Sequence, residues 1–175
     1  MQRTTACAEL VVKALDECLK THGFEDLTIT ELCQVSTIGR ATFYRLFDDP
    51  QDVVSYKCEL LAQEFSSGLF GANIKEMQRQ FFKMWMENSD FLKLIVALHR
   101  TDIILDCHRK HLEAICDELK KGGAEIDLND YYMIMLTNIL VGSLLVWCEH
   151  GCREETEELI ANIKKAVSDI GLLLG

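Results

Sequence analysis

The sequence predicts an all-α protein of about nine helices, and three observations lead to this prediction. Hydrophobic residues make up 49% of the chain, which contains a single proline and ten glycines. No stretch alternates apolar and polar residues as a half-buried strand would, and there is no Asn-Gly or Asp-Gly hairpin turn. Apolar residues instead recur at helical spacing between capping residues. At 175 residues the chain is long enough for one large or two small domains with ample cores.

The first predicted helix runs over residues 5–21. Its apolar residues recur three and four positions apart, so they form one stripe that packs inward. The members of this expected buried stripe are Leu10, Val11, Ala14, Leu15 and Cys18.

Two short helices joined by a tight turn are predicted within residues 28–47. The letters TITE at positions 28–31 indicate a capping box. In such a box the Thr28 hydroxyl and the Glu31 carboxylate each bind a backbone N–H that the helix leaves free. We expect Ile38 to fill the turn and Gly39 to relieve the backbone where the second helix begins.

The second of these helices has two different faces. Its spacing predicts that one face is buried and carries Phe43, Leu46 and Phe47. The opposite face is small or polar and carries Arg40, Ala41, Tyr44 and Arg45. Because arginine can bond a guanine edge twice and a tyrosine hydroxyl can hold a phosphate, this face suits a DNA major groove. An ordinary helical hairpin is the alternative, but it explains only the buried aromatics.

The same stretch resembles the N-terminal domain of the TetR family of transcriptional regulators. The letters TFYR at 42–45, followed by Phe47, are similar to that family's signature, and the match extends back to Gly23-Phe24. The resemblance implies a helix-turn-helix DNA-binding domain over residues 1–50 and a helical effector-binding and dimerisation domain over residues 51–175. It also implies a homodimer that binds a palindromic operator in double-stranded DNA. The residues expected to contact DNA are Thr28, Thr30, Arg40, Ala41, Thr42, Tyr44 and Arg45.

A fourth helix is predicted to begin at Asp49 and Pro50, an N-cap and a favourable first helical residue, and to run to about residue 67. The family usually has a lysine at this start and often a histidine before the last aromatic of the preceding helix. This chain has Pro50 and Leu46 there, with Asp48, Asp49 and Asp52 nearby. The added negative charge weakens neutralisation of DNA phosphates. It favours the alternative of a dimeric adaptor, or co-activator, of the same fold with weakened or lost DNA binding.

Three further helices are predicted from their caps and stops, over residues 74–87, 91–99 and 102–121. The first is rich in methionine and aromatic residues, which form either a plain core or the wall of an apolar cavity. The residues expected to line a pocket for a small apolar effector are Phe82, Trp85, His99, Tyr132 and Met133.

The last two predicted helices cover residues 128–149 and 154–173. The first is apolar nearly all round, so it should be buried on every side, and the second opens with four glutamates. This end of the chain resembles a TetR-family subgroup in which the last two helices of each subunit form a four-helix dimer interface. The residues expected in that interface are Gly142, Leu145, Leu159, Ile163 and Val167. The alternative is a monomer with a central core helix.

The net charge of −10 argues against nonspecific binding of nucleic acid by the whole chain. Residues 1–47 account for only −1 of it and residues 48–175 for −9. The N-terminus lacks a signal sequence, and no apolar run reaches the ~18 residues of a membrane span. We therefore expect a cytoplasmic protein with no membrane partner, whose eight cysteines are mostly reduced.

Other chemistry has little support in the sequence. The letters CHRKH at 107–111 and CEHGC at 148–152 do not match a zinc-finger spacing, so we expect exposed histidines beside buried cysteines, without metal or cofactor. Cys148 and Cys152 could form a redox pair if a neighbour such as Arg153 lowered a thiol pKa. No phosphate loop or nucleophile motif is present, so an enzyme is not expected. The favoured interpretation is a homodimeric repressor that a small apolar effector releases from DNA.

Overall fold

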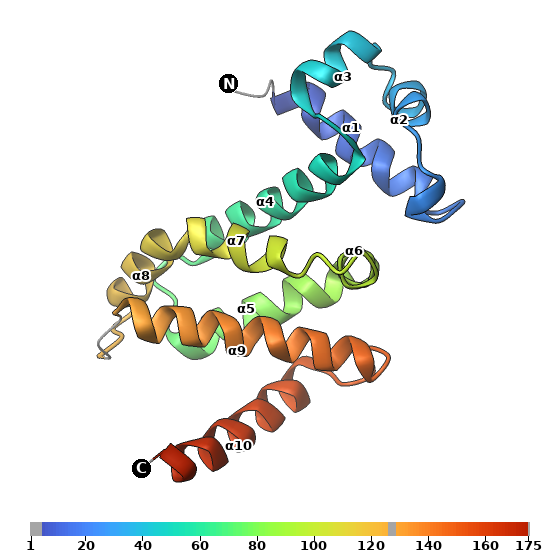
Figure 1. Cartoon of the computed structure of the whole chain (residues 1–175). Coiled ribbons are helices and arrows are strands. Elements are labelled where there is room, and N and C mark those ends of the chain that lie inside the picture. The colour runs from blue at the N-terminus through green and yellow to red at the C-terminus, as the bar shows by residue number, and fades with distance from the viewer. Residues whose placement is uncertain (1–4, 126–128, 175) are drawn as a thin grey trace. The chain divides into compact units, whose positions relative to one another are not determined.

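The computed structural model describes residues 5–125 and 129–174, and all regular structure within them is helical. These residues form ten α-helices and one short 3-10 helix, which confirms the all-α prediction. The chain divides into two compact units, Met1–Leu60 and Leu61–Gly175. Figure 1 shows the order of the helices along the chain.

The N-terminal unit consists of three helices, a short 3-10 turn and the first part of a fourth helix. Their bounds are α1 Thr5–Cys18, η1 Phe24–Asp26, α2 Ile29–Ser36, α3 Arg40–Leu46 and α4 Pro50–Gly68. Helix α1 packs against α2, and α2 packs against α3. Lys57 of α4 is ion-paired with Asp16 of α1. The fully buried side chains of this unit include Val11, Leu15, Leu32, Phe43, Phe47, Val53, Val54 and Cys58.

Two details of α1 and α4 bear on the sequence predictions. Leu10 is 44% exposed, so its expected burial was wrong, whereas the other four residues of the predicted stripe are buried, together with Ala8. The start of α4 is as expected, because the Asp49 carboxylate accepts a hydrogen bond from the Asp52 N–H at 2.9 Å.

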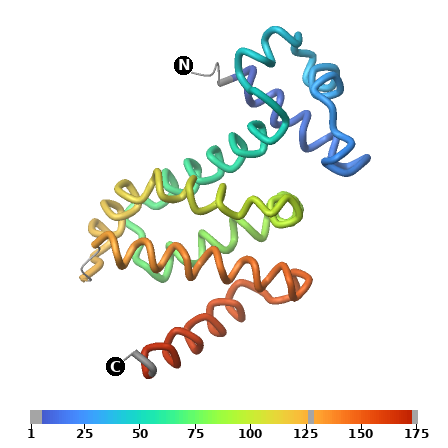
Figure 2. Tube along the Cα trace, viewed as in Figure 1, coloured from blue at the N-terminus to red at the C-terminus, as the bar shows by residue number. Residues whose placement is uncertain are grey.

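The C-terminal unit contains the rest of α4 and six further helices. Their bounds are α5 Ile74–Glu87, α6 Ser89–Ala97, α7 Asp102–Lys110, α8 Leu112–Lys121, α9 Asp130–Glu149 and α10 Thr156–Leu174. Helix α9 packs against α5, α6, α7 and α10, so it is the central element of this unit, as the tube in Figure 2 lets the reader follow. The fully buried side chains include Phe81, Phe82, Trp85, Leu92, Ile95, Ile104 and Leu119.

Two predictions for this unit were wrong. The single helix expected over residues 102–121 is two helices, because the backbone leaves helical geometry at His111, where φ is −104° and ψ is 4°. Helix α9 is not buried on every side: Tyr131, Met135 and Val146 are 84%, 59% and 46% exposed. Their spacings of four and eleven residues are close to one and three helical turns, so the three side chains leave one apolar face uncovered. Leu128, where the helix was expected to begin, lies outside the described residues.

The loop between α4 and α5 is docked on the end of α8. Gly71 has a left-handed backbone, and its N–H donates to the Glu118 carboxylate at 3.0 Å. At Gly122 a Cβ atom would lie 2.3 Å from the Ala72 carbonyl oxygen, so no other residue fits there without moving the backbone. This contact fixes the loop that carries the buried Leu69 and the exposed Phe70.

Candidate nucleic-acid interface

The start of α2 is capped from two directions. Thr28 is extended, and its hydroxyl accepts a hydrogen bond from the Glu31 N–H at 3.2 Å, as predicted. The Glu31 carboxylate does not complete the expected capping box. It accepts instead from the His22 ring at 2.8 Å, because the preceding turn brings that ring within reach. Thr28 and Thr30 are exposed at this helix start.

The turn between α2 and α3 relies on a threonine rather than a glycine. Thr37 adopts the left-handed region, with φ 57° and ψ 24°, and its N–H donates back to the end of α2. Gly39 is extended with φ −66°, a backbone that any residue adopts, so its expected role in relieving the backbone was wrong. Ile38 is buried in the turn as expected.

Helix α3 presents one aromatic face to the core and one polar face to solvent. Phe43 and Phe47 are fully buried with ring centroids 5.6 Å apart, and Phe47 meets Tyr56 of α4 at 5.5 Å. The opposite face carries four exposed side chains, with Thr42 half-buried beside them: Arg40, Ala41, Tyr44 and Arg45. Tyr44 is 52% exposed, and its ring meets Phe43 edge-on at 5.8 Å. The core thus orients a helix whose free face is basic and aromatic.

The carboxylates at the start of α4 have local structural roles. The Asp52 carboxylate accepts from the Asp48 N–H at 3.3 Å, while the Asp52 N–H donates to Asp49. Negative charge at a helix N-terminus is offset by the helix dipole. These residues therefore stabilise the α3–α4 connection while keeping formal negative charge on the surface of this unit.

The predicted effector-pocket residues do not gather around one cavity. The C-terminal unit has a small internal cavity of about 20 Å³, room for about one water molecule. Of the predicted residues only Met133 lines it. Phe82 and Trp85 are buried elsewhere, Tyr132 is half-buried, and His99 is exposed with a left-handed φ of 54°. The cavity is lined by Phe65, Met77, Phe81, His108, Leu112, Ile115, Met133, Leu136, Thr137 and Leu140.

His108 is buried, whereas the sequence predicted that the histidines of this segment are exposed. It is 2% exposed, its Nε2 accepts a hydrogen bond from the Trp85 indole N–H at 3.4 Å, and its ring lies 5.0 Å from Phe81. The burial of His108 could have been predicted from helical spacing, because His108 follows Ile104 by four positions on the apolar face of α7. Within the described residues, no group of three or more possible metal ligands is present.

The predicted dimer residues divide into two sets. Leu159 is buried within the protomer, while Gly142, Leu145 and Ile163 are half-buried and Val167 is 42% exposed. Nothing lies within 4 Å of a Cβ built on Gly142, so this face of α9 is open.

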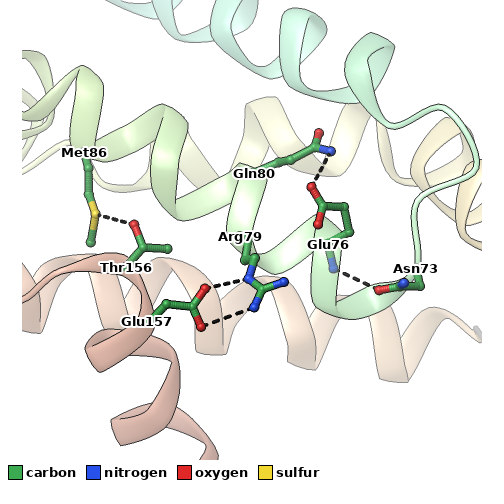
Figure 3. Close-up of polar contacts among 7 residues, drawn as sticks. All are labelled: Asn73, Glu76, Arg79, Gln80, Met86, Thr156 and Glu157. Atoms are coloured by element: carbon green, nitrogen blue, oxygen red, sulfur yellow. Dashed lines mark hydrogen bonds and ion pairs between the residues drawn. The ribbon is translucent and has the colours of Figure 1, made fainter.

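The start of α10 is fastened to α5, as Figure 3 shows. Arg79 of α5 donates to both carboxylate oxygens of Glu157, at 2.6 and 3.4 Å, and this pairing holds the pKa of Glu157 below its usual value. The Thr156 hydroxyl lies 3.1 Å from the Met86 sulfur. Beyond Ile160, residues 161–172 are half-buried or exposed, including Ala166, Val167 and Ile170 on the apolar side of the helix. Helix α10 therefore has one anchored half and one unpartnered half.

The Cys148 thiol, in the last turn of α9, is not an activated thiol. Burial first, and then the adjacent Cys152 thiol, raise the pKa of Cys148 to about 12. The condition stated for a redox pair, a neighbour that lowers a thiol pKa, is therefore not met at Cys148, because burial and Cys152 outweigh the nearby Lys93 ammonium.

One described helix, α9, is long and apolar enough to cross a membrane by length and composition alone. The core helix of a helical domain passes the same test, and α9 packs against four other helices of its unit.

A helix-turn-helix unit with a basic, aromatic free face, joined to a helical unit with an open apolar face, defines the class of helical transcriptional regulators. A family model described as the C-terminal region of TetR-type transcriptional regulators matches residues 72–169. The chain therefore belongs to the TetR family of transcriptional regulators. None of the curated proteins matches it.

Proposed function

We propose that this regulator is a cytoplasmic, non-enzymatic, homodimeric repressor that binds a palindromic operator through α3 and is released by a small apolar effector. The observation that carries the proposal is the free face of α3. Arg40, Tyr44 and Arg45 are exposed on a helix whose opposite face is locked into the core by Phe43 and Phe47. A rigid helix with side chains of this chemistry suits base and phosphate contacts in a major groove.

Two classes of DNA contact follow from the chemistry of this face. Arg40 and Arg45 are candidates for reading guanine edges, while Tyr44 and the exposed threonines at the start of α2, Thr28 and Thr30, suit phosphates. Ala41 is small enough to approach a base methyl group, and Thr42 borders the same face. A base contact sets specificity, whereas a phosphate contact changes the affinity for every sequence alike.

The test is selection of DNA duplexes from genomic fragments at low salt. The affinity of protein variants for a selected duplex is then measured. Arg45→Ala should cost about 1–3 kcal/mol on the selected duplex and relax one base position. Tyr44→Phe should weaken binding to all duplexes alike. Arg153→Ala, at an exposed arginine of the C-terminal unit, is the matched control and should leave binding unchanged. Equal losses on selected and random duplexes for Arg45→Ala would contradict base reading.

The dimer is supported by the open faces of α9 and α10. Exposed apolar residues that recur at helical spacing on two adjacent helices are suited to covering by a second copy. Gly142 would allow close approach of the two copies, with Leu145, Ile163 and Val167 beside it. Leu159 would support this surface from beneath, since it is buried within the protomer.

The effector part of the proposal concerns the small cavity of the C-terminal unit. That cavity of about 20 Å³ is smaller than a metabolite, so an effector that binds at this place would bind an opened form of the unit. It would shift the population of dimers only if it binds that form better than the closed one. Thermal shift and Trp85 fluorescence against hydrophobic metabolites test this, and a library in which no compound stabilises the protein would contradict it.

The second candidate function is a dimeric adaptor, or co-activator, that keeps the fold without reading DNA. The carboxylates of Asp48, Asp49 and Asp52 favour it, because they oppose the phosphate-driven part of binding. Selection at low salt separates the two candidates. Enrichment of a palindrome supports the repressor, and recovery of no palindrome supports the adaptor.

A further inference from the structure

His22 lies where both of its ring nitrogens face an acceptor. Nδ1 is 2.9 Å from the Gly23 carbonyl oxygen, and Nε2 is 2.8 Å from a Glu31 carboxylate oxygen. A carbonyl oxygen has no proton to give, and neither has an ionised carboxylate. A neutral imidazole has only one N–H, so it would turn one lone pair toward an oxygen. The imidazolium alone donates to both, so the geometry selects the charged ring.

The charged ring joins three parts of the N-terminal unit. Glu31 lies in the first turn of α2, and its own N–H donates to the Thr28 cap. The Cys18 thiol at the end of α1 also hydrogen-bonds Glu31, and burial together with this carboxylate raises the pKa of Cys18. His22 itself lies in the turn that connects the two helices. The Glu31 carboxylate thus accepts from the end of α1 and from the turn, while the Glu31 backbone N–H donates to the Thr28 cap of α2.

The charged groups around His22 all act in one direction. Glu31 faces it from α2, and Asp26 faces it from the 3-10 turn η1. On α1, the Cys18 thiol bonds Glu31, and Glu17 is paired with Lys20. Residues 1–60 contain no second histidine. The unit therefore has one side chain whose ordinary titration range lies near neutral pH, and it is placed in its main interhelical polar cluster.

We propose that His22 is a pH-sensitive clamp: its imidazolium holds the α1–α2 turn and the start of α2 in the DNA-reading arrangement, and losing the proton lowers operator affinity. The inference rests on the proposed function, because Thr28 and Thr30 at the clamped helix start are proposed DNA contacts. The ligand that regulates the protein at this site is the proton. The clamp therefore couples pH to occupancy of the operator.

The direction of the effect follows from the two bonds. The Gly23 carbonyl first, and then the Glu31 carboxylate, raise the pKa of His22 above its ordinary value of 6.5. A group whose pKa is raised on folding stabilises the folded unit fully below the unfolded value. That stability is lost as pH rises through the raised value. The N-terminal unit should therefore loosen on the alkaline side of neutrality.

The first experiment follows the His22 ring by NMR in the full chain between pH 5.5 and 9. Both ring nitrogens should carry protons at the low end, and the titration midpoint should exceed 6.5. Glu31→Gln keeps the shape and the backbone cap but removes the charge, so it should lower the midpoint. A midpoint at or below 6.5 in the unmodified protein, or one that Glu31→Gln leaves unchanged, overturns the inference.

The second experiment measures affinity for a palindromic duplex recovered by the selection described above, over the same pH range. Affinity should fall as pH rises, by at most about tenfold for each pKa unit that separates bound from free protein. His22→Gln cannot titrate and should make the profile flat. His99→Asn is the control, since His99 is exposed in the C-terminal unit and asparagine tolerates its left-handed backbone.

The outcomes separate this inference from the proposed function. A duplex that binds equally well at pH 6.5 and 8.5, or a pH dependence that persists in His22→Gln, overturns the clamp and leaves the DNA-binding proposal standing. A raised midpoint in a protein that binds no duplex at any pH overturns the DNA-binding proposal together with its regulation by His22.

Discussion

The two units of this protein differ in how completely each buries its own apolar residues. In the N-terminal unit Phe43 and Phe47 are fully buried, and Tyr44 on the free face of α3 ends in a hydroxyl. In the C-terminal unit the outer half of α10 and one side of α9 expose Val167, Ile170 and Met135. The difference motivates the proposed dimer, in which a second copy would cover the exposed apolar residues of the C-terminal unit.

The largest expected effect is loss of the proposed dimer in Val167→Glu. Val167 is already exposed, so the protomer should fold normally, but the interface would bury an unpaired carboxylate at a cost of several kcal/mol. Sedimentation should show dimers of the unmodified protein at micromolar concentration and monomers of the variant. Lys165→Glu introduces a carboxylate on the opposite face of α10, with an even larger change in net charge, and should remain dimeric. If the unmodified protein is monomeric at micromolar concentration, the proposed dimer through the C-terminal unit is contradicted.

A second prediction sharpens the comparison within the C-terminal unit. Gly122→Ala places a Cβ against the backbone oxygens of Gly71 and Ala72, so the α4–α5 loop must move. Overpacking of this kind costs about 1–3 kcal/mol, and a clash with backbone favours the upper end. Gly142→Ala meets nothing within 4 Å and should raise the unfolding midpoint of the monomeric form slightly, because alanine stabilises a helix interior by roughly 0.5–1 kcal/mol relative to glycine. Equal denaturant midpoints for the two variants would contradict the docked loop.

A third prediction compares helix caps in the two units. Thr28→Ala and Asn73→Ala each remove one side-chain bond to a backbone N–H, worth about 1 kcal/mol. Thr28 lies next to the His22–Glu31 pair, so its removal should also lower the His22 titration midpoint. Asn73→Ala should leave that midpoint unchanged. Denaturant unfolding and NMR titration of both variants check the two parts, and a shift in both variants would count against a local effect.

The smallest expected effect concerns the pH dependence of the C-terminal unit, whose sign is opposite to that of the clamp. The Lys121 ammonium first, and then the Gly71 N–H, hold the pKa of Glu118 below its ordinary value of 4.5. The stability that this carboxylate contributes is present above 4.5 and lost as pH falls through the lowered value. The protection factor of the Gly71 amide, which corrects for the intrinsic exchange rate at each pH, should therefore fall in acid, and Glu118→Gln should abolish that fall.

Local signals in the sequence predicted most of the fold. Helix α5 begins after Asn73 and ends at Glu87 as expected, because capping and periodicity act over a few residues. The break at His111 could not be predicted. The apolar residues continue in phase from Ile104 through His108 to Ile115, and no glycine or proline marks the break. Packing between distant segments decides it.

In the candidate sites, too, features set by local spacing could be predicted, and contacts between distant residues could not. The exposed and buried faces of α3 follow from spacing alone. The bond between Glu31 and His22 joins residues nine apart across a turn, and no sequence rule specifies it. The lining of the small described cavity is set by side-chain packing among five helices, and of the predicted pocket residues only Met133 belongs to it. His99 shows the reason, since helix α6 ended at Ala97 and left it in an exposed left-handed turn.

The left-handed threonine in the helix-turn-helix has a consequence for protein engineering. A branched side chain at φ 57° costs roughly 1–2 kcal/mol, and Thr37 is exposed, so no packing of its own offsets that cost. Replacement by glycine or asparagine should therefore raise the melting temperature by a few degrees, since about 1 kcal/mol shifts Tm by several degrees in a domain of this size. Substitutions of Thr37 should therefore be among the first that directed evolution selects when a more heat-stable regulator is sought.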